Sequence, residues 1–174
     1  SLSLSYGMLL LLGPVWALAV YAVARKRWEP LVWAALGTAV IPVLFMLAGF
    51  NWWDGAHATR DHYQAGVASR RPLSYFVFAN VAVIAAVAGP AVVAGVARLR
   101  HRASWWLVGG ALAGIAAANF SGLSKGEVER IWLPAVPFLL LACTAFVSRT
   151  ERRTWLGLQL AVGIVMQFYI RSPW

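Results

Sequence analysis

Residues 121–137 read SGLSKGEVERIWLPAVP and place four charged side chains between two long apolar segments. Two prolines, Pro134 and Pro137, open the second of these segments. Charged side chains are costly inside a lipid bilayer, so the stretch predicts a loop at a membrane surface and invites a functional interpretation. The apolar segments on either side of the loop therefore decide the fold class.

The composition is that of a chain with lipid as its solvent. Apolar residues make up 61% of the 174 residues, charged residues make up 12%, and ten residues are Trp. A soluble domain has about half apolar and about a quarter charged residues. Because one membrane span takes about 20 residues, the chain has room for about six spans. We therefore expect an all-α, polytopic transmembrane helical bundle that forms a single domain over residues 1–174, with no soluble domain.

Basic residues mark alternate linkers between the apolar segments. The expected segments are 5–24, 31–50, 74–97, 104–120, 131–147 and 154–170. The first, third and fifth linkers carry nine of the fifteen basic residues: Arg25, Lys26, Arg27, Arg98, Arg100, Arg102, Arg149, Arg152 and Arg153. The positive-inside rule places these linkers in the cytoplasm. Linkers 51–74 and 121–130 then lie outside, and they hold four of the six acidic residues.

The net charge of +9 does not indicate nucleic acid, because the basic residues form short clusters between apolar segments. Membrane topology and anionic lipid headgroups explain such clusters better, so membrane lipids are the expected general partner. Cys143 is the single cysteine, which excludes a disulfide framework and a thiolate metal site. The expected location is a membrane, in which the chain is an integral protein. Because the chain opens with SLSLSYG and no initiator Met, we expect it to be the C-terminal portion of a larger membrane protein, with an N-terminal segment or a partner chain missing.

The first outer linker predicts a helix that lies on the membrane surface. Trp52 and Trp53 suit the headgroup region, and the run from Asp54 to Gly66 has the length of a short helix. Asp54, His57 and Asp61 share one helical face at this spacing. Two interpretations of that face stay open. In the first it has a chemical role, because it binds a divalent metal or supplies an acid or base. In the second it is only the solvated polar surface of an interfacial helix.

Four cationic residues on the outer linkers are candidate ligands for a lipid phosphate. Arg70 and Arg71 end the first outer linker and either hold a phosphate or act as snorkelling anchors. Arg130 stands at the mouth of the proline-opened segment, where it can bind a phosphate bidentately beside the more mobile charge of Lys125. The alternative for Arg130 is an ion pair with a glutamate of the same loop, which would only fix the loop.

The series FSGLSKGEVERIWLPAVPFLLLAC resembles the late-loop pattern of GT-C superfamily glycosyltransferases, which take their sugar from a polyprenyl phosphate. Bacterial relatives of protein mannosyltransferases and of the lipid A aminoarabinose transferase have this arrangement. The stretches GEVERIWLP and YQAGVASRRP are also similar to sequences of actinobacterial membrane proteins grouped with them. The matching positions are Phe120, Ser121, Lys125, Arg130, Trp132, Leu133, Pro134 and Pro137. The likeness covers about 25 residues. It departs from the family because no segment matches the first outer loop, which carries the catalytic acidic residue.

The resemblance implies transfer of a sugar from a polyprenyl-phosphate donor to an acceptor at the extracytoplasmic face. In that scheme Lys125, Arg130, Arg70 and Arg71 hold the donor phosphate, and the sugar pocket includes residues of the first outer linker: Trp52, Trp53, Asp54, His57 and Asp61. The catalytic residue stays unknown and is expected outside this chain. No cofactor is evident, although a divalent metal is possible in such enzymes.

Two functions from other classes stay open. A transporter or flippase half usually needs a polar site near the middle of the bilayer. The polar residues within the apolar segments are few and uncharged: Thr38, Asn80, Asn119, Thr144 and Gln159. The third alternative is a non-catalytic structural membrane subunit.

Overall fold

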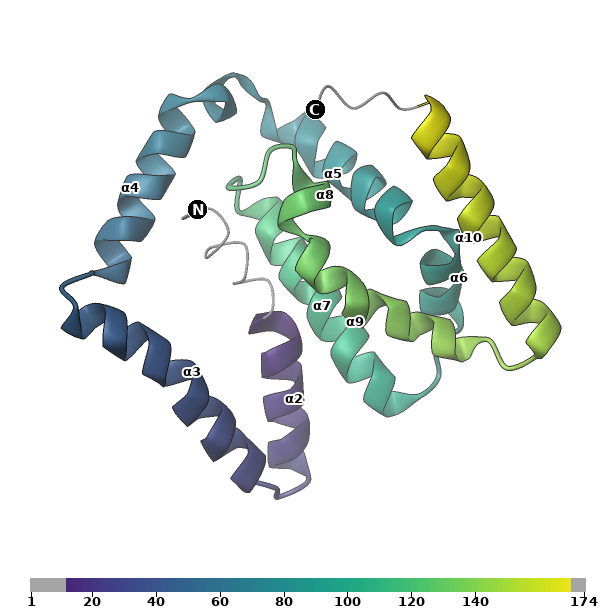
Figure 1. Ribbon diagram of the computed structural model, residues 1–174, viewed down its shortest axis with the longest axis horizontal. Helices are drawn as coiled ribbons and strands as arrows, with labels where there is room; N and C mark the ends of the chain where they lie inside the picture. Colours follow the sequence, from purple (N-terminus) through teal and green to yellow (C-terminus); the bar gives the residue numbers. More distant parts are fainter. Residues whose placement is uncertain (1–11, 170–174) are drawn as a thin grey trace.

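The computed structural model describes residues 12–169, and every element in that range is helical (Figure 1). The longer helices are α2 (Leu12–Ala24), α3 (Glu29–Leu47), α4 (Trp52–Ala65), α5 (Leu73–Ala88), α6 (Pro90–Arg98), α7 (Arg102–Phe120) and α10 (Arg149–Tyr169). The shorter ones are η2 (Val67–Arg70), α8 (Val128–Ile131), η3 (Leu133–Ala135), α9 (Val136–Leu140) and η4 (Leu141–Ala145). The prediction of an all-α fold is confirmed. The first residues of expected segment 5–24 and the last of 154–170 lie outside the described range.

The core is built by α5, α6, α7 and the run from α8 to η4, with α7 and α9 lying alongside each other (Figure 1). Val108 and Ala111 of α7 are fully buried against this run. Trp132 and Ala142 are fully buried on the facing side. These apolar contacts hold together segments that are far apart in sequence and so position the loops at both ends of the bundle.

Helix α2 packs against α7 in antiparallel direction, because Gly13 lies at Gly110 while Tyr21 lies near Trp106. A Cβ added to Gly110 would lie 2.6 Å from the carbonyl oxygen of Gly13, so the two backbones meet without room for a side chain. Small residues allow this close approach between helices in membranes.

Helices α3 and α4 form an open corner beside the core (Figure 1). Large apolar side chains stand out from α3, and Trp33 and Leu47 are 73% and 79% exposed. Contiguous apolar surface of this kind favours contact with lipid or a partner over contact with water. Helix α4 confirms the short helix expected over Asp54–Gly66, and the Asn51 side chain caps it by accepting a hydrogen bond from the Trp53 N–H at 3.0 Å.

Within residues 12–169, one helix is long and apolar enough to cross a membrane alone, and that helix is α7. Two bent helix pairs, α3 with α4 and α5 with α6, bring the number to three if each pair forms one span. The stretches Gly13–Ala24 and Leu133–Ala145 are apolar but shorter than a full span. At least one membrane-compatible helix is therefore present, whereas the expected six spans are not confirmed.

The expected span 74–97 is not one helix. It breaks at Gly89, where α5 and α6 meet at 95°. Gly89 has φ of +82°, and Pro90 begins α6 without a backbone N–H to continue the α5 ladder. The side-chain amide of Gln159 from α10 bridges the break, since it donates to the Ala88 carbonyl at 2.8 Å and accepts from the Ala91 N–H at 3.2 Å.

The expected segment 131–147 also differs from a continuous helix. The structure divides it into η3, α9 and η4, with Pro134 near the start of η3 and Pro137 near the start of α9. Each proline removes one backbone donor and fixes its φ near −65°. The segment is therefore a chain of short helical turns, and its path along α7 is set by packing rather than by one hydrogen-bond ladder.

Candidate functional site

The loop between α7 and α8 turns through three residues of positive φ. They are Gly122 at 71°, Gly126 at 94° and Glu127 at 58°. The left-handed region costs a non-glycine residue roughly 1–2 kcal/mol, so Glu127 is held there by its surroundings. The loop backbone is thus a fixed surface at the end of the bundle.

A buried pair of asparagines holds the loop from below. Asn80 of α5 and Asn119 of α7 are 2% and 3% exposed, and the Asn80 amide donates to the Asn119 side-chain oxygen at 3.0 Å. The same Asn80 amide donates to the Ser124 carbonyl at 2.6 Å, while its oxygen accepts from the Gly126 N–H at 3.3 Å. Asn119 in turn donates to the Val77 carbonyl at 3.0 Å. Two buried amides therefore satisfy the inner side of the loop.

The first outer linker holds the loop from the other side, at Lys125. The Lys125 N–H donates to the Tyr63 hydroxyl at 2.7 Å, and the Arg71 guanidinium donates to the Lys125 carbonyl at 2.5 Å. Both contacts join residues more than fifty positions apart in sequence. The linkers 51–74 and 121–130, which the charge pattern assigned to one side of the membrane, thus meet at one end of the fold.

Two of the four predicted phosphate ligands come together here. Arg71 and Lys125 are half-buried and in contact, and the Arg71 guanidinium also lies 5.4 Å from the centre of the Phe76 ring. Arg70 in η2 and Arg130 in α8 are exposed. Arg71 offers five N–H groups in all, so the bond to the Lys125 carbonyl leaves donors for an anion.

The predicted substrate-pocket residues lie together along α4. Trp52 is half-buried and packs edge-on against Phe45 and Phe50, with ring centroids 5.9 and 5.5 Å away. Trp53 is 76% exposed. The three polar residues of the same helix, Asp54, His57 and Asp61, are also exposed. They form an open polar surface rather than an enclosed pocket, and residues 12–169 contain no group of three His, Cys, Asp or Glu able to hold a metal ion.

The polar residues inside the apolar segments have structural partners. Asn80, Asn119 and Gln159 bond backbone groups of neighbouring segments, and the Thr144 hydroxyl donates to the Leu141 carbonyl at 2.7 Å. The side chain of Thr38 lies outside the described part of the chain. Sequence reasoning identified Asn80 and Asn119 only as polar positions in apolar helices, and it missed Tyr63, for which the sequence carries no signal.

The opposite end of the bundle gathers the basic linkers. Arg98 forms an ion pair with Glu151, which joins the third linker to the fifth. Tyr21, just before the first linker, lies 6.4 Å from Trp106 at the start of α7. All three basic linkers therefore lie at the end of the fold that is remote from loop 121–127.

Comparison of the chain with protein-family models, curated protein sequences and solved structures found no match.

Proposed function

We propose that this chain is part of an integral membrane glycosyltransferase of the GT-C type, which transfers a sugar from a polyprenyl-phosphate donor to an acceptor at the extracytoplasmic face. The observation that carries the proposal is the contact between Arg71 and Lys125, at 2.5 Å from guanidinium to carbonyl. It joins the two outer linkers at one end of the fold, and in this proposal the side chains of Arg71 and Lys125 form one cationic patch at the membrane surface. Such a patch would stabilise the departing polyprenyl phosphate, because catalysis of its departure is mainly stabilisation of developing charge.

The loop supports this role through its rigidity. Catalytic charge stabilisation depends on donors that are already in position before the reaction. The loop 121–127 is bonded to Asn80, Tyr63 and Arg71, so its backbone does not need to reorganise when an anion arrives. Arg130 follows on α8 and, in this proposal, supplies the bidentate phosphate contact at the exposed side of the patch. The proposal assigns no residue of this chain to activation of the acceptor.

The proposed topology has six membrane segments. In this arrangement α2, α3, the α5–α6 pair, α7, the η3–η4 run and α10 cross or enter the bilayer. Helix α4 lies on the outer surface. The pairing of like linkers supports the arrangement, since Arg98 contacts Glu151 at one end and Arg71 contacts Lys125 at the other. The membrane would be a bacterial plasma membrane.

The experiment is a binding measurement with polyprenyl phosphate and the purified 174-residue chain in detergent micelles, read by native mass spectrometry. Arg130→Lys should weaken binding by at least about tenfold, because an ammonium cannot form two parallel hydrogen bonds to a phosphate. Lys125→Ala should weaken it as well. Arg153→Lys, on an exposed site of α10, is the matched control and should bind like the unmodified chain.

Two results would overturn the proposal. The first is equal binding of polyprenyl phosphate and the uncharged polyprenol, since the patch would then not recognise phosphate. The second is unchanged binding by both Arg130→Lys and Lys125→Ala. In that case these side chains only fix the loop. An exposed ion pair between such a side chain and a loop glutamate contributes about 0–1 kcal/mol to the stability of the fold.

A further inference from the structure

A groove with apolar walls runs between α2 and α7, beside the close contact of Gly13 with Gly110. Its volume is about 470 Å³, and its walls include three tryptophans, Trp16 from α2 and Trp105 and Trp106 from α7. The indole N–H of Trp105 is already bonded to the Leu99 carbonyl at 2.6 Å. The groove floor is made of small residues, among them Gly109. Such a channel accepts a hydrocarbon chain rather than a polar ligand.

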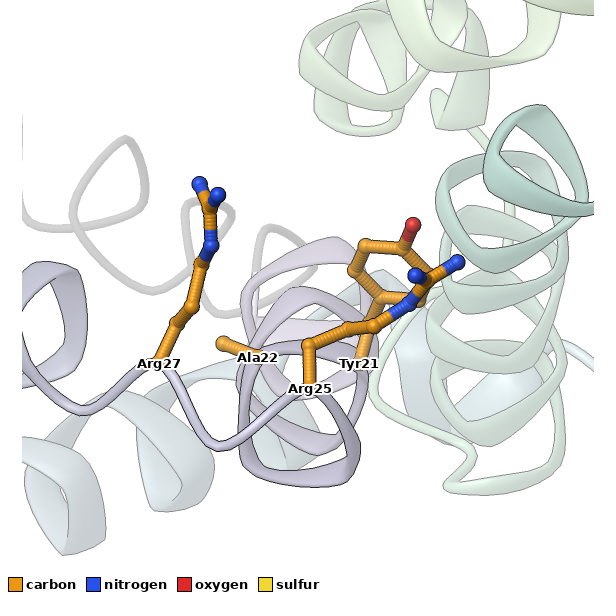
Figure 2. A pocket seen from close by; sticks show the side chains of 4 residues that line it. All are labelled: Tyr21, Ala22, Arg25 and Arg27. Carbon is orange, nitrogen blue, oxygen red and sulfur yellow. The ribbon is translucent and has the colours of Figure 1, made fainter.

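A second hollow of about 530 Å³ lies at the C-terminal end of α2 and is lined by Tyr21, Ala22, Arg25 and Arg27. Figure 2 shows Arg25 lying along the Tyr21 ring on one side of Ala22, and Arg27 extending from the turn on the other side. The Arg25 guanidinium is 5.4 Å from the centre of that ring. Stacking on an aromatic ring restrains the guanidinium and leaves its N–H edge for an anion.

Among the residues that the structure describes, no carboxylate forms an ion pair with Arg25 or Arg27. Within residues 12–169, the ion pair that forms joins Arg98 to Glu151. Glu29, the acidic residue of the same linker, begins α3 and is exposed. Two guanidinium groups without a carboxylate partner at a membrane surface attract a phosphate.

The groove and the hollow both border α2 and neighbour each other at Tyr21 and Trp106. Tyr21 lines the hollow and lies 6.4 Å from Trp106, which lines the groove. Arg102 begins α7 at the same end, so the charge there is further positive. This end is separated from loop 121–127 by the 19 residues of α7, roughly 28 Å of helix.

We propose that these two hollows form one binding site for an anionic phospholipid of the cytoplasmic leaflet. The headgroup phosphate lies between Arg25 and Arg27, and one acyl chain lies along the three tryptophans of the groove. The two guanidinium groups select the anionic headgroup, and the apolar groove requires an attached hydrocarbon chain. The site does not depend on the proposed transferase function, because it shares no residue with the loop site.

The test is native mass spectrometry of the purified chain with phosphatidylglycerol and phosphatidylcholine of identical acyl chains. We expect tighter binding of phosphatidylglycerol, and a loss of at least about tenfold in the double variant Arg25→Gln/Arg27→Gln. The matched control is Arg149→Gln/Arg152→Gln, which removes the same charge from the same end of the fold but away from the groove. It should keep its selectivity.

The groove is tested separately by Gly109→Leu. A Cβ at this position has ordinary contact, with its nearest atom in the Trp105 ring at 3.7 Å, so the helix accepts the change while the rest of the side chain fills the groove. Binding of phosphatidylglycerol should fall although both arginines remain. The proposal is overturned if the two lipids bind equally, if the Arg149/Arg152 control loses as much selectivity as the Arg25/Arg27 variant, or if Gly109→Leu binds like the unmodified chain.

Discussion

Asn80 and Asn119 join helices α5 and α7 through a single amide-to-amide hydrogen bond of 3.0 Å in the buried core. Between them the two side chains also bond the backbones of Val77, Ser124 and Gly126. Polar side chains in apolar helices are often interpreted as transport or catalytic sites. Here their bonding capacity is used to fix the loop that carries Lys125.

The first prediction concerns this pair. Asn80→Leu should lower the free energy of unfolding by about 2 kcal/mol, because Ser124 and Gly126 each lose a buried partner. Unfolding by a denaturing detergent, followed by circular dichroism, measures the change. Thr144→Val serves as control, since that exposed hydroxyl bonds only its own turn, and a loss of equal size in this variant would contradict the role assigned to Asn80.

The second prediction concerns Gly126. A Cβ here would lie 2.7 Å from the Arg71 guanidinium, and the residue has φ of +94°. Gly126→Ala should destabilise the fold by about 1–3 kcal/mol and weaken polyprenyl-phosphate binding. Gly157→Ala is the matched control, because Gly157 is helical with open space at its Cβ and should gain up to about 1 kcal/mol. Equal stability of the two variants would show that the Gly126 turn is not constrained.

The third prediction concerns Gln159. Gln159→Leu leaves the Ala88 carbonyl and the Ala91 N–H without their partner, so the α5–α6 corner should loosen. The Ala91 amide should then exchange its hydrogen at least about tenfold faster, as expected when an opening becomes easier by about 1.4 kcal/mol. Gln167→Leu, at an exposed site on the same helix, should leave this rate unchanged. Protection of Ala91 in both variants would exclude Gln159 as the clamp.

The fourth prediction concerns sidedness. In a Cys143→Ala background, cysteines at Ala65 and Leu123 should react with an impermeant thiol reagent in intact cells, since both side chains are exposed on outer linkers. A cysteine at Thr150, exposed on the fifth linker, should react only after the membrane is permeabilised. The reverse pattern would invert the topology and remove the loop site from the outer face.

Local features were predictable from the sequence, whereas long-range contacts were not. The all-helical fold follows from composition, and α4 follows from its polar run after Asn51. The alternating charge of the linkers indicates which of them share an end, and the contact of Arg71 with Lys125 agrees with that pattern. The atoms involved were not predictable, because the Arg71 guanidinium donates to the backbone carbonyl of Lys125, and no side-chain pattern marks that acceptor.

The sequence-based expectations that proved wrong are the two continuous helices over 74–97 and 131–147, which the structure divides into shorter ones. An apolar run with Gly89 and Pro90 is compatible with a straight, kinked or broken helix, and hydropathy does not distinguish these. The structure has the broken form, and the side chain that bonds both sides of the break, Gln159, lies 71 residues after Ala88. Tyr63 likewise lies 62 residues before its partner Lys125. Single-sequence patterns carry no information on such pairs.

The clamp at the α5–α6 corner has a consequence for biosynthesis. Residues 73–98 leave the ribosome well before Gln159, because 71 residues separate Ala88 from the side chain that bonds it. During that interval the corner lacks its protein hydrogen bonds, and chain segments fold in the order in which they are made. The bend therefore gains its last two hydrogen bonds only when the last helix arrives, so truncation before α10 should release a nascent chain in which this corner is looser than in the whole chain.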